Sequence, residues 1–315
     1  MLCKMIAIAT AIGMMYLRAE AAGKAVAEVM ADHTLSGTQK EVSRTLDDQK
    51  TPYNVTGDYF VDTGAELIVK PGVTIIFAKN AGFTIQGGLK MEGTVENPIV
   101  CRGNSSGIGV WQGIKICSNA NADFEGVSIT GAKCGLQLDE KTDVRKCSIC
   151  KNEIGIVAKG NEYTFEDLYI CDNRGDAIQV GHPTLDHCTI SRNGGNGLCG
   201  WGGCDIIGSV IFKNKKAGID CWNAGHDVTV NSSYLAENKK FDIHNGCEKT
   251  WDCTENYWGP SVTKMLELKG DSVNLPRIYD RKDKPDAGIV NISKWLTEVP
   301  KECGAREYPG MPKKK

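Results

Sequence analysis

Short segments that alternate apolar and polar residues recur along the chain, and several of them end in an asparagine. These asparagines follow one another at intervals of 21, 20, 21, 24 and 18 residues, at Asn152, Asn173, Asn193, Asn214, Asn238 and Asn256. After each of the first five, a short break precedes a second alternating run. The pattern predicts two short β-strands per repeat, separated by a turn at the asparagine.

Strands of about five residues that recur every ~20 residues predict a solenoid whose coils stack as parallel sheets. The repeats contain no helical period, which excludes the crossover helices of an α/β fold. We expect alternate residues to face inward and to stack on their counterparts, namely Cys147, Ile149, Leu168, Ile170, Cys188, Ile190 and Ile211. We also expect each asparagine to adopt the left-handed backbone of a sharp turn and to bond its amide to the next coil.

Several motifs outside the repeats carry a resemblance to a known family. They are Ser36-Gly37, Pro52-Tyr-Asn-Val-Thr-Gly57, Pro71-Gly-Val-Thr74, Glu92-Gly-Thr-Val-Glu-Asn-Pro-Ile99, Trp111-Gln-Gly-Ile114 and the closing Asn256-Tyr-Trp-Gly259. Together with the asparagine-ended repeats, they resemble bacterial right-handed parallel β-helix proteins of the pectin-lyase-like superfamily. The resemblance implies an all-β, single-stranded right-handed parallel β-helix of about ten coils. It implies little about function, because this scaffold serves lyases, hydrolases, epimerases and non-enzymatic surface proteins.

The organisation that we expect has four parts. Residues 1–21 read as a signal peptide, with Lys4, an apolar run over residues 5–17 and an Ala-x-Ala site at Ala19–Ala21. A buried N-terminal helix is the alternative. Residues 22–58 would form an entry segment and N-terminal cap, residues 59–259 the β-helix, and residues 260–315 a C-terminal extension packed on its end or side. We therefore expect a protein that is secreted, periplasmic or on the cell surface.

Charge and hydropathy exclude two classes of partner. The chain has 37 basic and 39 acidic residues and a net charge of -2, so nothing favours nucleic-acid binding. The apolar run at the N-terminus is shorter than the ~20 residues that a membrane span needs, and no other stretch is long enough.

The candidate chemistry lies in two columns of charged residues that appear when the repeats are aligned on their asparagines. One column holds Arg145, Glu166 and Asp186, and the next holds Lys146, Asp167 and His187. Neighbours in a column would lie roughly 5 Å apart. Glu166, Asp167, Asp186 and His187 are therefore candidate catalytic residues for acid–base work on an acidic polysaccharide. The alternative is a salt-bridged outer wall, since charges on any solenoid must stack on something.

Other residues near these columns are candidates for binding. Lys146 and Tyr169 would lie beside the carboxylates, and Trp201 and Trp222 lie one coil apart near the second strand. Exposed tryptophans would form a platform for sugar rings; packing under the loops is the alternative. We expect no cofactor and no dedicated metal site, although the carboxylates would suit calcium bound with an acidic glycan.

The chain has 14 cysteines, of which most fall at inward positions and read as small core residues. The bridges that spacing favours are Cys150–Cys171, Cys199–Cys204 and Cys247–Cys253. The pair Cys147 and Cys150 resembles a metal knuckle, but positions i and i+3 of a strand face opposite sides, which argues against zinc.

Two functions of different class remain. The first is an exported, non-catalytic β-helix protein that binds polysaccharide or forms part of a surface or matrix. The second is a polysaccharide lyase or glycoside hydrolase that acts on acidic polysaccharide. Asp176 and Gly181-His182 are faintly similar to polygalacturonase motifs, but the chain lacks that family's second aspartate and has Pro183 in place of a glycine. These departures favour the non-catalytic function.

Overall fold

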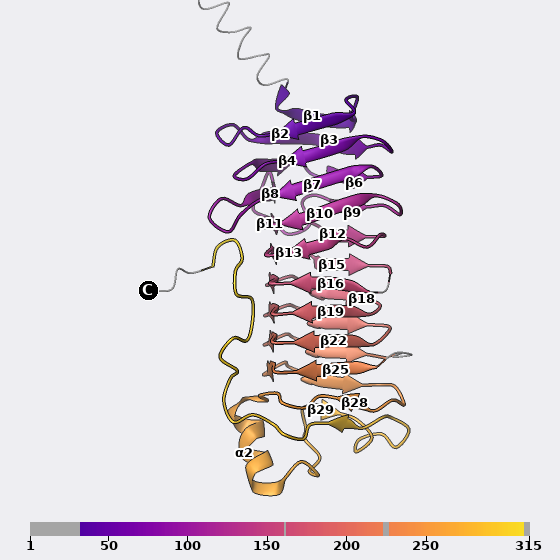
Figure 1. Ribbon diagram of the computed structural model, residues 1–315, viewed down its shortest axis with the longest axis vertical. Coiled ribbons are helices and arrows are strands. Elements are labelled where there is room, and N and C mark those ends of the chain that lie inside the picture. Colours follow the sequence, from indigo (N-terminus) through magenta and orange to yellow (C-terminus); the bar gives the residue numbers. More distant parts are fainter. Residues whose placement is uncertain (1–31, 161, 223–226, 312–315) are drawn as a thin grey trace, which may run out of the picture.

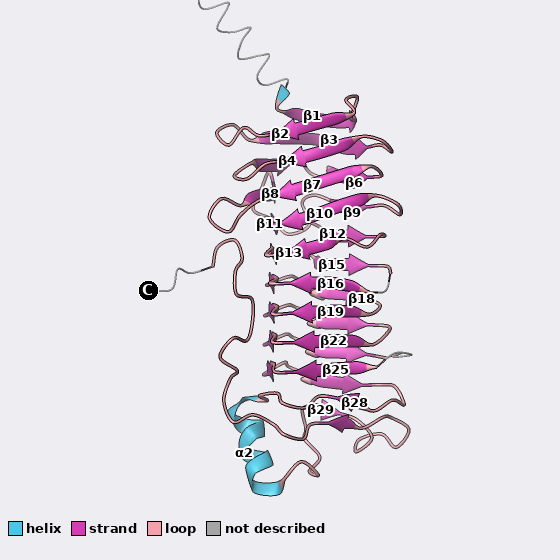
Figure 2. Ribbon diagram, viewed as in Figure 1, coloured by secondary structure: helices cyan, strands magenta, loops and turns pink. Residues whose placement is uncertain are grey.

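The computed structural model describes residues 32–160, 162–222 and 227–311. They form a long stack of coils in which the strands pair in parallel (Figures 1 and 2). The expected signal peptide lies outside the described residues. The first coil begins at β1 (Thr34–Thr38), which pairs with β3 (Tyr53–Val61), so parallel pairing starts within the expected entry segment.

One face of the stack is an 11-stranded sheet. Its strands are β2 (Ser43–Leu46), β4 (Glu66–Val69), β7 (Gly88–Glu92), β10 (Asn121–Glu125), β13 (Asp143–Arg145), β16 (Tyr163–Glu166), β19 (Pro183–Asp186), β22 (Cys204–Ile207), β25 (Val228–Asn231), β28 (Trp251–Asp252) and β30 (Val290–Asn291). Successive side chains of each strand point alternately into the core and toward solvent, as in Tyr163–Glu166, whose first and third residues are buried.

The other strands form a 19-stranded sheet that bends at the asparagine turn. Before the turn lie β5 (Thr74–Phe77), β8 (Ile99–Gly103), β11 (Val127–Thr130), β14 (Ser148–Cys150), β17 (Tyr169–Cys171), β20 (Thr189–Ser191), β23 (Val210–Phe212) and β26 (Tyr234–Ala236). After it lie β6 (Gly82–Ile85), β9 (Gly113–Ile116), β12 (Cys134–Leu138), β15 (Ile154–Ala158), β18 (Ile178–Val180), β21 (Leu198–Gly200), β24 (Ile219–Cys221), β27 (Ile243–Asn245) and β29 (Ile278–Tyr279). The long strand β3 pairs with both β5 and β6.

The interior of the coils is the hydrophobic core. All seven residues predicted to face inward are at most 1% exposed, and Ile149, Ile170, Ile190 and Ile211 stack one on another through successive coils. Cys147 and Cys188 also lie in the core, where burial raises the pKa of each thiol to about 12. These thiols stay protonated and serve as packing groups rather than nucleophiles.

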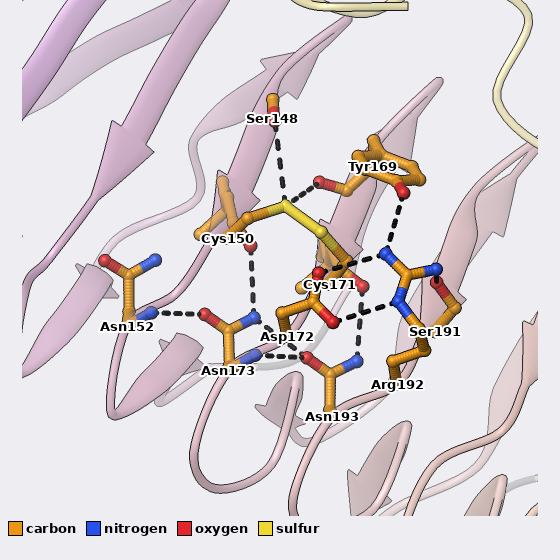
Figure 3. The surroundings of a disulfide bond; sticks show 12 residues. Ser148, Cys150, Asn152, Tyr169, Cys171, Asp172, Asn173, Ser191, Arg192 and Asn193 are labelled. Carbon is orange, nitrogen blue, oxygen red and sulfur yellow. Dashed lines mark hydrogen bonds and ion pairs between the residues drawn. A yellow bond between two sulfur atoms is a disulfide. The ribbon is translucent and has the colours of Figure 1, made fainter. Parts of the chain in front are cut away.

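The asparagine ladder is present (Figure 3). The side chain of Asn173 donates to Oδ1 of Asn193 at 2.9 Å, and Asn193 donates to Asn214 over the same distance. Our expectation about the backbone was wrong, because the left-handed residue is the one before the asparagine, as at Lys151 (φ 59°) and Arg192 (φ 57°). That preceding residue points outward, so its side chain is free to vary while the asparagine stays buried.

One predicted disulfide is confirmed and two are wrong. Cys150 and Cys171 join two neighbouring coils beside the ladder (Figure 3). The four cysteines of the other two predicted pairs are free thiols. Cys199 lies on β21 of the 19-stranded sheet and is partly exposed, whereas Cys204 lies on β22 of the 11-stranded sheet and is fully buried. Cys247 instead accepts a hydrogen bond from the indole of the buried Trp251.

The C-terminal extension closes one end of the stack and then returns along its side. The helix α2 (Gly259–Lys269) begins after the buried Trp258 at the end of the last coil. The chain then adds β29 and β30 to the two sheets and runs back along the coils, where it is drawn in yellow (Figure 1). The segment at residues 303–308 is hereafter called the C-terminal strap.

Candidate functional site

The two predicted columns of charged residues are where the repeat alignment placed them. Glu166 pairs in register with Arg145 on one side and with Asp186 on the other. The next residues in each coil, Lys146, Asp167 and His187, all have φ between 50° and 52°. This left-handed conformation turns the chain between the two sheets and directs both columns to the outside of the same corner.

The C-terminal strap covers this corner. The amide of Gly304 donates to the carbonyl of Gly208 at 2.7 Å, and the amide of Ala305 donates to Oγ1 of Thr189 at 2.9 Å. The strap thus crosses the turns of adjacent coils, on the left in Figure 1. Sequence reasoning placed the extension on the end or side of the helix but did not connect it with the charged columns.

Arg306 of the strap binds two of the three candidate catalytic carboxylates. Its guanidinium contacts both oxygens of Asp167, at 2.9 Å from Nε and 2.8 Å from Nη2, and it reaches Oε1 of Glu166 at 2.9 Å. The backbone amide of Arg306 donates to Asp167 as well. Asp167 is 2% exposed, and its carboxylate raises the pKa of Arg306 above the usual range of an arginine. Asp167 is therefore a buried partner of the strap.

The binding candidates beside the carboxylates are also held by the strap. Lys146 forms ion pairs with Glu307 at 3.2 Å and with Glu125 at 3.6 Å, and the hydrogen bond to Glu307 raises the pKa of Lys146. The ring of Tyr169 stacks on Tyr308 with centroids 4.2 Å apart. Both side chains are only partly exposed, and each is held by a residue of the strap.

Asp186 and His187 are the remaining catalytic candidates, and they contact each other. Oδ1 of Asp186 lies 2.5 Å from Nδ1 of His187. The ring of His187 packs against Gly208, where a Cβ atom would lie 2.8 Å from Nε2. A histidine oriented by an aspartate is a familiar general base, but here the second ring nitrogen faces backbone instead of a cavity.

Trp201 and Trp222 lie at a different corner from the charged columns. They follow β21 and β24, whereas the charged columns end β13, β16 and β19, and the amide of Trp222 donates to the carbonyl of Gly200. Trp222 is 57% exposed, whereas Trp201 is partly buried. The predicted ligand-binding set therefore divides between two corners of the coil.

The part of the molecule that the structure describes holds no group of three or more His, Cys, Asp or Glu side chains arranged for a metal ion. It also contains no helix that is long and apolar enough to cross a membrane.

Sequence reasoning missed a cleft of about 580 Å³. Its lining includes Arg102, the loop at residues 103–108, Thr130 and Lys151. The signal was present in the chain, since residues 104–112 connect β8 to β9 whereas residues 131–133 suffice for the same turn in the next coil. An insertion at one turn of a regular repeat marks a place where the surface departs from the flat wall of the solenoid.

Two family models match the chain. The model of a pectate-lyase like β-helix domain matches residues 37–141, and the model of a right-handed β-helix region matches residues 104–235. The search of curated proteins found no significant match, and neither did the search of solved structures. The matched segments coincide with the stacked parallel coils. The chain is therefore a right-handed parallel β-helix, and its residues 37–141 are similar to the pectate-lyase like β-helix domain.

Proposed function

We propose that the protein is an exported, non-catalytic β-helix protein that binds polysaccharide. The observation that carries the proposal is the contact of Arg306 with Asp167 and Glu166 at the predicted acid–base cluster. A general acid or base must reach the proton that it transfers, and a glycosidase needs two carboxylates that both face the sugar. Asp167, which is almost fully buried under the chain's own strap, does neither.

Three further features support the proposal: the first concerns export, and the other two concern binding to a polysaccharide. The Cys150–Cys171 disulfide is of a kind that persists in secreted, periplasmic and surface proteins. The coils repeat every ~4.8 Å and present polar columns on their outer faces, which suits a long polymer better than a small molecule. Trp222 offers an exposed ring at one corner for contact with a sugar.

The test uses the purified full chain and a panel of pectate, alginate, neutral glycans and sulfated glycans. New reducing ends and unsaturated uronate absorbance report turnover, with and without calcium, while co-sedimentation with insoluble glycan reports binding. We expect binding to at least one glycan without turnover. Turnover that disappears in Asp186→Ala, but persists in the exposed control Asp143→Ala, would contradict the proposal.

The second candidate is a carbohydrate-active enzyme, and the contact between Asp186 and His187 favours it. In that case the strap would hold the site closed. Arg306→Ala in the full chain separates the two functions, because it removes the guanidinium from Glu166 and Asp167 without altering either residue. Turnover by this variant, absent from the wild-type protein, would establish the enzyme; unchanged inactivity supports the binding protein.

A further inference from the structure

The lining of the cleft of about 580 Å³ includes no residue of the strap and none of the two charged columns. Arg102 on β8 is in register with Thr130 on β11, and Thr130 is in register with Cys150, which directly precedes Lys151. The loop at residues 103–108 forms the opposite wall. Arg102 and Lys151 therefore flank one opening although 49 positions separate them along the chain.

These two cations differ from most of those on the surrounding coils. Within the residues that the structure places, neither Arg102 nor Lys151 has a carboxylate within ion-pair distance. By contrast, Lys70, Lys90, Arg145, Lys146, Arg174, Arg192 and Lys213 each have one. Glu153, two residues after Lys151, pairs with Arg174 at 3.0 Å. The guanidinium of Arg102 makes one bond, to the carbonyl of Gly103, and its other donors remain for a ligand.

The rest of the lining combines polar side chains with Ile108 and three glycines, Gly103, Gly107 and Gly131. Asn104, Ser105, Ser106 and Thr130 supply amide and hydroxyl groups. The loop is fixed at both ends, because the amide of Asn104 donates to Phe77 and the amide of Val110 donates to Gly131. Gly131 (φ 81°) lets the loop approach closely, since a Cβ atom there would lie 3.1 Å from the carbonyl oxygen of Gly107. A preformed wall reduces the cost of ordering on binding.

We infer that this cleft binds an anionic group, carboxylate or sulfate, carried on a sugar chain. The inference rests on the proposed function and locates the binding. The planar guanidinium matches a two-oxygen anion, and Lys151 adds a second charge from the other side. The hydroxyl and amide groups of the loop suit the hydroxyls of the sugar. The lining includes no carboxylate, so the cleft offers neither calcium ligands nor a carboxylic acid–base pair.

The experiment measures dissociation constants by isothermal titration calorimetry at low salt. The probes are a uronate trisaccharide, a sulfated disaccharide, the corresponding neutral sugars and inorganic sulfate. The variants are Arg102→Gln and Lys151→Gln. The matched control is Lys213→Gln, because Lys213 occupies the same outward position of a later coil with nearly the same backbone angle, φ 57° against 59°. Lys213 differs in having Glu237 as its ion-pair partner.

We expect the wild-type protein to bind a uronate or sulfated sugar more tightly than its neutral counterpart. Arg102→Gln and Lys151→Gln should each weaken that binding by about tenfold or more, as the loss of one charge-assisted hydrogen bond does. Lys213→Gln should leave it unchanged. Circular dichroism of each variant reports whether the coils remain intact.

Three results would contradict these expectations, and each overturns a different part of the argument. If the protein binds an acidic glycan and neither Arg102→Gln nor Lys151→Gln weakens the binding, the cleft is not the binding site. The proposed function would still stand. Failure of every glycan to bind the wild-type protein would overturn the proposed function and the inference with it. Inorganic sulfate bound as tightly as the sulfated sugar would overturn the sugar as the ligand.

Discussion

In the coils that contain β14, β17 and β20, one turn precedes each of these strands and another follows it. The two turns satisfy their polar groups in different ways. Both use a left-handed residue, at Lys151 and Arg192 in the asparagine turn and at Lys146 and His187 in the other. The asparagine turn repeats one residue type through successive coils, and each side chain bonds to the next. The other turn repeats no single residue type at the equivalent buried position, directly after the left-handed residue: it has Val127, Cys147, Leu168, Cys188, Ser209 and Ser233.

The varied turn is completed from elsewhere in the chain. Asp167 receives four hydrogen bonds from Arg306, which lies 139 residues away in the sequence. The inward side of this turn has a partial ladder of its own, where the amide of Cys188 donates to Ser209 and that of Ser209 donates to Ser233. A uniform column satisfies its own polar groups, whereas a varied one needs an external partner. The strap is that partner.

The largest expected effect breaks the uniform column at Asn193. Asn193→Ala removes the acceptor of the buried Asn173 amide and the donor to the Ile170 carbonyl. Each buried group left without a partner costs about 1–3 kcal/mol, so the free energy of unfolding should fall by about 3 kcal/mol or more. Urea denaturation measures it. The control Asn121→Ala, at an exposed position, should stay within about 0.5 kcal/mol of the wild type.

The next effect concerns the covalent link beside that column. Replacing both Cys150 and Cys171 by serine removes a cross-link between positions 21 residues apart. Closing a loop of this size stabilises a protein by about 3 kcal/mol in the chain-entropy model. Thermal and urea denaturation should both reveal the loss, and the half-buried free thiol Cys117 provides a control as Cys117→Ala. Equal stabilities of the double variant and the wild type would mean that the ladder alone holds these coils together.

The periodic parts of the molecule could be predicted from the sequence. The inward columns, the register of Arg145, Glu166 and Asp186, and the asparagine ladder all follow from alignment of equivalent positions, because stacking converts sequence period into spatial neighbourhood. The Cys150–Cys171 pair follows for the same reason, since both residues occupy one column.

The aperiodic parts could not be predicted in this way. Alignment shows that Glu166 and Asp167 lie near Asp186, but it carries no information about Arg306, which belongs to no repeat. The wrong pairs Cys199–Cys204 and Cys247–Cys253 came from proximity along the chain, which does not reveal that Cys199 and Cys204 belong to different sheets. The cleft depends on the path of the 103–108 loop, of which the sequence reveals only the extra length.

A smaller effect tests whether the strap completes the varied turn in solution. Arg306→Ala leaves the buried carboxylate of Asp167 without its cation, although the partly exposed guanidinium limits the cost to about 1–2 kcal/mol. Arg174→Ala removes an exposed pair with Glu153 and should change the free energy of unfolding by less. If the two variants are equally stable, the strap contributes nothing to this corner. Asp167→Asn combined with Arg306→Ala should recover part of the loss, since no buried charge then remains.

The smallest effect lies where the uniform column ends and itself needs an external partner. Asn238, the last asparagine in the bonded series, donates to Asp242, which in turn pairs with Arg277 at 2.8 Å. Burial raises the pKa of the Asp242 carboxyl, and Arg277 opposes the shift only in part. The native state therefore holds this proton more tightly than the unfolded state does, so its contribution to stability falls as the pH rises above about 4.

Asp242→Asn removes that titration. Between pH 4 and the raised native pKa of Asp242, the free energy of unfolding of the wild-type protein minus that of the variant should decline as the pH rises. Leaving Arg277 without its carboxylate changes this difference by a constant and does not affect its slope. Urea denaturation of both proteins across this range measures the difference. A difference that increases with pH would mean that Arg277 outweighs burial and that the ladder ends on a stable carboxylate. The end of the uniform column would then resemble the Asp167–Arg306 contact under the strap, with one arginine completing each.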